Sequence, residues 1–140
     1  MNELKLIASL FPIIFMLHEF EEIIGFKHWV TKDGAWIAKK YPKVAKQISF
    51  YERLSVPAFA LAVLEEFIII GIVTVLVLTL QWYNVWIAVF SGFSLHILIH
   101  IGQWMIVRKY IPIIITSLLS IPYIIWVSIA SYVHLLLLRL

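Results

Sequence analysis

The 140-residue sequence contains no cysteine. Disulfides, iron–sulfur clusters and thiolate-bound metals are therefore excluded. Charged residues are also scarce, at 14% of the chain, whereas an ordinary soluble domain has about 25%. Hydrophobic residues reach 63%, above the usual range of about 45–50%. This composition is too apolar for a soluble globular protein, and it predicts a single integral membrane domain over residues 1–140.

Four apolar stretches are long enough to cross a bilayer, which takes about 20 residues in a helix. They cover residues 4–26, 54–80, 85–107 and 113–138. The last three are joined by short connections, which place successive helices side by side. We therefore expect an all-α protein, an integral membrane four-helix bundle.

The connection between the first two stretches, residues 27–53, is polar and rich in lysine. Tyr41, Val44, Ile48 and Tyr51 recur within it at helical spacing. This pattern predicts a short basic interfacial helix lying on anionic headgroups. A solvated basic loop is the alternative. No nucleic-acid partner is expected so close to the bilayer.

The Lys/Arg bias of the connections predicts how the chain is oriented. Residues 27–53 and the turn at 108–112 are basic, whereas the turn at 81–84 has no charge. The basic loops should therefore be cytoplasmic, and both termini should face the other side.

A polar motif, His18-Glu19-Phe20-Glu21-Glu22, ends the first apolar stretch. On a helix, His18, Glu21 and Glu22 share one face, because they are three and four residues apart. A carboxylate at the centre of a membrane helix costs about 2.5–3.5 kcal/mol. Other polar groups must compensate for this cost. Glu19 points about 100° away from His18. We expect it to contact one of the metal-binding side chains or a neighbouring helix, rather than to bind the metal itself.

Two further polar pairs lie in later stretches, Glu65-Glu66 in the second and His96 with His100 in the third. Measured from the basic helix ends at 1.5 Å per residue, all these groups lie roughly 6–18 Å deep. A bundle could point them inward together. His134 lies near the opposite end of the fourth stretch and is left out, as is His28, which lies beyond the first.

Clustered carboxylates and imidazoles in hydrocarbon need a counter-charge. One solution is a divalent metal, and this ligand set suits Fe, Zn or Mn, bound as one ion or as a dinuclear centre. The other solutions are shared protons between Glu and His, or a structural polar seam. The candidate metal ligands are His18, Glu21, Glu22, Glu65, Glu66, His96 and His100.

The motif resembles the one that gives the HXXEE family of small integral membrane proteins its name. The resemblance continues through residues 59–67, 96–100 and 110–116, so it covers nearly the whole chain. Many relatives have Asn one turn before the histidine matching His100, where this chain has His96. The resemblance implies a largely prokaryotic membrane protein with no assigned reaction.

Two functions fit these residues. The first is a membrane metalloenzyme, a hydrolase or a di-iron-type oxidoreductase, acting on a lipid or other hydrophobic substrate, with Glu66 and Tyr123 as catalytic residues. The alternative is a metal-ion or proton transporter or channel using the same cluster. Its pore could form as a homo-oligomer through Gly92 and neighbouring serines. A metal-stabilised assembly partner without turnover is a third interpretation.

Overall fold

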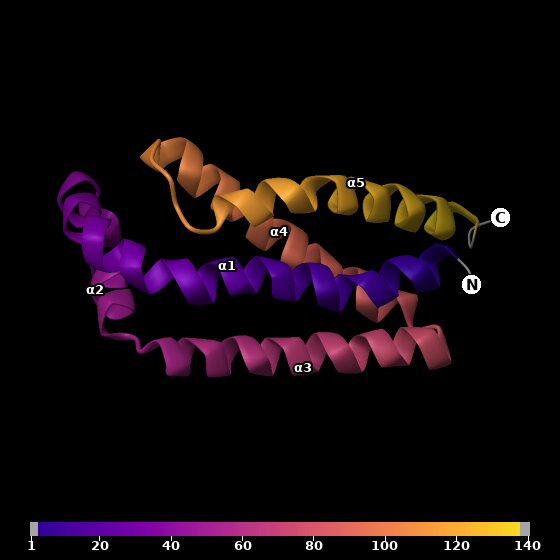
Figure 1. The fold of residues 1–140 in the computed structure, drawn as a ribbon. Coiled ribbons are helices and arrows are strands. Elements are labelled where there is room, and N and C mark those ends of the chain that lie inside the picture. The colour runs from indigo at the N-terminus through magenta and orange to yellow at the C-terminus, as the bar shows by residue number, and fades with distance from the viewer. Residues whose placement is uncertain (1–2, 138–140) are drawn as a thin grey trace.

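The computed structural model describes residues 3–137, which are almost entirely helical (Figure 1). In chain order the elements are α1 (Glu3–Lys40), the short 3-10 turn η1 (Pro42–Val44), α2 (Ala45–Arg53), α3 (Val56–Leu80), α4 (Tyr83–Val107) and α5 (Ile114–Leu137). The predicted all-α fold class is confirmed.

Three of these helices, α3, α4 and α5, are long and apolar enough to cross a membrane, which indicates an integral membrane protein. They begin and end close to the predicted stretches 54–80, 85–107 and 113–138. Residue 138 lies outside the described residues. Within the described chain α1 is not among these three helices, because Lys5 and the acidic motif interrupt its apolar run.

The first helix is longer than the predicted stretch at residues 4–26, since α1 continues without a break to Lys40. Residues 27–40 contain no proline, and Pro42 then ends the helix, because the residue before a proline is disfavoured in the α conformation. Tyr41 accordingly has φ −127° and ψ 77°. The interfacial helix is therefore confined to α2. It packs against α1 where Gly34 has no side chain, since a Cβ there would lie 2.9 Å from Ile48 Cγ2.

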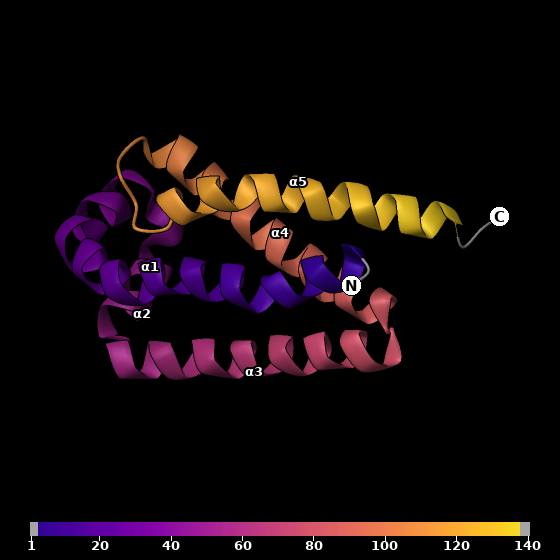
Figure 2. The ribbon, with the colours of Figure 1, turned by 45° about the vertical axis from the view of Figure 1, so that its right-hand side comes forward.

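The helix α1 contacts α2, α3, α4 and α5, so it is the element around which the bundle is arranged. The start of α1 and the end of α5 lie at one end of the bundle, and α2 with the end of α1 lies at the other (Figures 1 and 2). Gln81 and Arg108 end α3 and α4 in the left-handed conformation, with φ of 59° and 54°. These tight caps reverse the chain and place successive spans side by side.

Rings fill the half of the bundle nearest the start of α1. Phe11 is fully buried and makes edge contacts with Trp86, Phe90 and Phe93 at centroid distances of 5.4–6.0 Å. Tyr123 of α5 also lies in this core, and its hydroxyl donates to the Ile7 carbonyl at 2.8 Å. Buried aromatic and aliphatic side chains thus make up most of the core in this half of the protein.

Candidate metal centre

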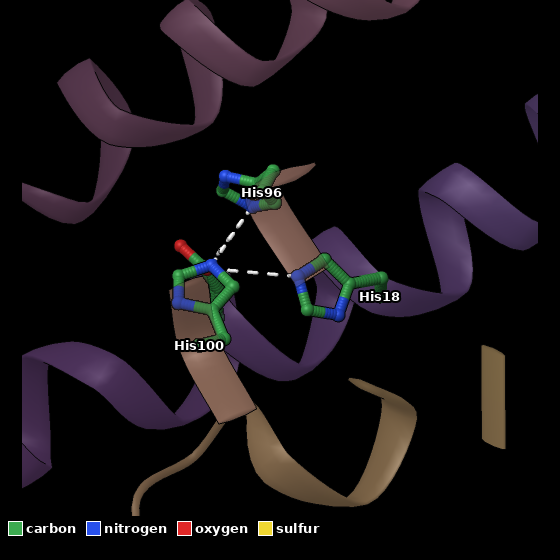
Figure 3. Close-up of side chains that lie close together, drawn as sticks. His18, His96 and His100 are labelled. Carbon is green, nitrogen blue, oxygen red and sulfur yellow. Dashed lines mark hydrogen bonds and ion pairs between the residues drawn. The ribbon is translucent and has the colours of Figure 1, made fainter. Parts of the chain in front are cut away.

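Four potential ligands meet between α1 and α4: His18, Glu22, His96 and His100. Each helix contributes two of them one turn apart, so both members of a pair face the other helix. One ligand atom from each residue lies within 4.8 Å of the other three. Figure 3 shows the three imidazoles turned toward one another. The group could hold a metal ion.

Two contacts within this cluster are of hydrogen-bond length. His100 Nε2 lies 2.8 Å from His96 Nε2 and 2.8 Å from Glu22 Oε1. His18 is fully buried, and among residues 3–137 its Nε2 has no hydrogen-bond partner. Leaving such a buried polar atom unpaired costs about 1–3 kcal/mol. A bound cation would pair this nitrogen, so the donor set fits a metal.

The other ring nitrogen of His18 is held by α5. His18 Nδ1 lies 3.0 Å from Thr116 Oγ1, and Thr116 donates to Glu21 Oε2 from both its hydroxyl, at 2.5 Å, and its backbone N–H, at 2.8 Å. Because the hydroxyl has one hydrogen and gives it to Glu21, it must accept from His18 Nδ1. Nε2 therefore carries the lone pair, which is the state that binds metal.

A second outer contact orients His100. Its Nδ1 lies 3.0 Å from the Gln103 Oε1, one turn further along α4. An amide oxygen only accepts, so Nδ1 carries the hydrogen, and in the neutral ring Nε2 carries the lone pair. When neutral, both imidazoles thus present an unprotonated Nε2 to the centre of the cluster, as metal-binding histidines with outer partners do.

Two more carboxylates border the cluster. Glu19 is buried, and its Oε1 lies 3.8 Å from His96 Nε2. A divalent ion bound by three neutral imidazoles and Glu22 keeps one positive charge, which Glu19 would balance in this low-dielectric setting. Glu66 of α3 lines the same cavity as Glu22, His96 and His100.

This cavity has a volume of about 840 Å³ and runs from the cluster to the basic end of the bundle. Its walls come from α1, α2, α3 and α4 and are mostly apolar. The side chain of His96 is 42% exposed, so the cluster is open to the cavity rather than sealed in the core. A cavity of this size accommodates a drug-sized or larger organic molecule.

The structure brings together four of the seven predicted ligands. Of the other three, Glu21 holds Thr116, Glu66 lines the cavity, and Glu65 is exposed and does not line it. Tyr123, predicted to be catalytic, is hydrogen-bonded to Ile7 within the aromatic core. The structure does not bring it to the cluster.

Sequence reasoning missed two residues of the site, Gln103 and Thr116. Gln103 follows His100 by three positions, a spacing that already predicts a shared helix face. Thr116 ends the stretch 110–116 that resembles the family, but no spacing linked it to the acidic motif, because the contact joins α5 to α1 across 95 residues. Glu19 was expected to contact a ligand or a helix, and it lies beside His96.

A family model described as a protein of unknown function with an HXXEE motif matches residues 9–127. The matched region contains all four residues of the cluster, and also Thr116 and Gln103. No curated protein and no solved structure matches the chain.

Proposed function

The chain belongs to the HXXEE family, whose function is unknown, and we propose that it is a membrane-embedded metal-dependent enzyme acting on a lipid or another hydrophobic substrate. The observation that carries this proposal is a buried group of four ligand atoms within 4.8 Å that opens into a mostly apolar cavity. In the membrane, the basic end would face the cytoplasm and both termini the other side.

Three imidazoles and one carboxylate form a ligand set for one divalent ion, and they suit Zn, Fe or Mn. When bound, such an ion with an open coordination position acts as a Lewis acid and can activate water or, in the case of iron, dioxygen. His18 and Glu22 would hold it from α1, and the two histidines of α4 from the other side.

The chain's own acid–base group in this proposal is Glu66. Its side chain is exposed and lines the same cavity as Glu22, His96 and His100. A carboxyl group there can accept a proton from a reacting group and return it later. Glu19 is buried against His96 and keeps the role of a charge neighbour.

The transporter alternative requires a polar route to the far end of the bundle. Instead, His18 contacts the ring of Phe93 at a centroid distance of 6.1 Å, and Phe93 packs on Phe11 at 5.4 Å. Trp86 and Phe90 stack behind them at 5.4 Å. These packed rings obstruct the passage of ions toward the far end, so access from one side favours an enzyme.

Elemental analysis of the detergent-purified protein tests the metal. We expect about one equivalent of Zn, Fe or Mn per chain, lost in His100→Ala and kept in His134→Ala, the matched control, whose ring packs on Tyr83 at the far end. An absorption spectrum then distinguishes Fe(III) from Zn. Wild-type protein that is folded and repeatedly purified without metal would overturn the proposal.

Turnover is tested separately with Glu66→Gln. We expect this variant to keep its metal and to lose product formation in membrane-lipid extracts by about 100-fold or more, the usual contribution of an acid–base group. Glu65→Gln, next to it on the exposed face, is the control. Metal flux in proteoliposomes, with no lipid product, would support the transporter instead.

A further inference from the structure

The cavity beside the cluster has two chemically different ends. At the inner end it is lined by Glu22, His96 and His100. At the outer end it is lined by Lys40, the last residue of α1, and by Lys43 of η1. Apolar side chains line the space between the two ends: Phe26, Ile37, Val44, Ile48, Phe59, Val63 and Ile113.

The two lysines at the outer end have no carboxylate partner among residues 3–137, where the only Lys or Arg ion pair joins Lys109 to Asp33. Both are exposed. The Lys40 ammonium lies over the rings of Trp36 and Tyr41, at 4.9 and 5.4 Å. Two cations without anionic neighbours at a membrane surface attract an anionic group.

Ala62 and Glu66 of α3 and Gln103 of α4 line the cavity and are exposed, which indicates a lateral opening between these two helices. In a bilayer this side faces lipid, so a ligand could enter from the membrane without passing through water. The opening therefore suits a molecule that already resides in the bilayer.

We propose that this cavity binds an anionic membrane lipid, with its headgroup at Lys40 and Lys43 and a hydrocarbon chain directed to the metal cluster. The identity of the inner end as a reaction site rests on the proposed function. Lipid binding itself requires only the apolar walls and the two lysines.

The length of α4 indicates which part of the lipid reaches the cluster. The Tyr41 hydroxyl donates to the Ile106 carbonyl, which places the outer end of the cavity beside this residue. His100 comes six residues earlier, or about 9 Å along the helix. With the headgroup held at the lysines, the cluster meets the hydrocarbon chain rather than the headgroup.

Binding of cis-parinaric acid, a fluorescent straight-chain fatty acid, tests this inference through energy transfer from the protein's tryptophans. The neutral methyl ester of the same acid is the matched ligand. We expect the acid to bind more tightly than the ester. Lys40→Gln and Lys43→Gln should each weaken binding of the acid about fivefold and leave that of the ester unchanged.

The matched control variants are Lys39→Gln and Lys46→Gln, which remove the same charge from residues that do not line the cavity. They should change neither ligand's affinity. Ala62→Trp, which fills the lateral opening, should weaken both ligands together. Equal affinity of acid and ester in the wild type, or equal losses in all four lysine variants, would overturn the proposal.

The same titration with His100→Ala separates this inference from the proposed function. We expect this variant to lose metal and to keep binding the acid. If the wild-type protein binds the acid but never contains metal, this inference stands and the proposed metal-dependent enzyme is rejected. A metal-loaded protein that binds acid and ester with equal affinity would overturn this inference and leave the proposed metal-dependent enzyme standing.

Discussion

The two ends of the bundle contain different kinds of side chain, aromatic at one end and polar at the other. Around Phe11 and Trp86, aromatic rings pack against one another. The Tyr123 hydroxyl in this region donates its described hydrogen bond to a backbone carbonyl. Around His18 and Glu22, polar groups point at one another and a cavity of about 840 Å³ lies beside them. The same two helices, α1 and α4, contribute to both regions.

This difference separates stability from chemistry along the same helices. A packed aromatic region holds α1 and α4 at a fixed distance, since interiors of this kind tolerate little movement. The polar cluster depends on that spacing, because four ligand atoms must stay within 4.8 Å. Changes in one region should therefore affect stability and changes in the other metal affinity.

The strongest challenge to this comparison is Glu22→Gln. It removes the cluster's only carboxylate, so we expect metal affinity to fall by more than the roughly 10–100-fold that loss of an outer partner costs. The melting temperature of the metal-free protein should hardly change. Competition with a fluorescent chelator measures the affinity. Unchanged affinity would remove Glu22 from the ligand set.

Phe11→Ala tests the other region. Phe11 is fully buried among rings, so truncation leaves a cavity and should cost about 2–4 kcal/mol of unfolding free energy, the loss being moderated because lipid is itself apolar. Unfolding in mixed micelles measures it. Phe20→Ala, on the exposed side of α1, is the control and should cost far less. Metal bound by the folded Phe11 variant should stay near one equivalent.

Thr116→Val tests whether the contact of α5 with His18 contributes to metal affinity. It keeps the shape of the side chain and removes the hydroxyl between His18 and Glu21. Metal affinity should fall about 10–100-fold, because the His18 ring loses its orientation and tautomer. Thr116→Ser should restore it, and Thr79→Val, whose hydroxyl bonds only within α3, should have no effect. Equal loss in the Ser and Val variants would point to packing instead.

The smallest effect is expected from Tyr110→Phe, in the turn before α5. Partial burial, followed by the Glu21 charge and the hydrogen bond to it, raises the pKa of the Tyr110 phenol. The folded chain therefore holds this proton more tightly than the unfolded chain. The stabilisation, about 0.5 kcal/mol, should be present below about pH 10 and disappear as the pH rises through the raised pKa.

Thermal unfolding of wild type and Tyr110→Phe at neutral and strongly alkaline pH measures this contribution. Tyr132→Phe, an exposed tyrosine of α5, serves as the control at both pH values. A difference between Tyr110→Phe and wild type that grows as the pH rises would have the wrong sign and would reject the role of the phenol.

Much of this arrangement was predictable from local patterns. Long apolar stretches predicted α3, α4 and α5 because length and hydrophobicity alone decide whether a helix can span a bilayer. The pairing of His96 with His100 followed from helical spacing. The continuation of α1 to Lys40 was not predicted, because its polar residues were interpreted as a connection, although residues 27–41 contain no proline.

Within the acidic motif, the roles of its members could not be read from their order. Glu21 and Glu22 each lie about one turn after His18 and are equally suitable as ligands by type. Their different partners depend on which helix packs against each: α4 brings His100 to Glu22, and α5 brings Thr116 to Glu21. Packing between helices in a membrane depends on side-chain fit, which a hydropathy pattern does not encode.

The amino-acid sequence by itself determined a helical membrane protein with polar groups at one depth, because both properties depend on residue type and helical repeat. Only the tertiary structure decided which of those groups form the cluster, which residue orients each imidazole and where the cavity opens. Those outcomes depend on contacts between helices far apart in the chain, and a side chain's neighbours there are set by packing rather than by its place in the sequence.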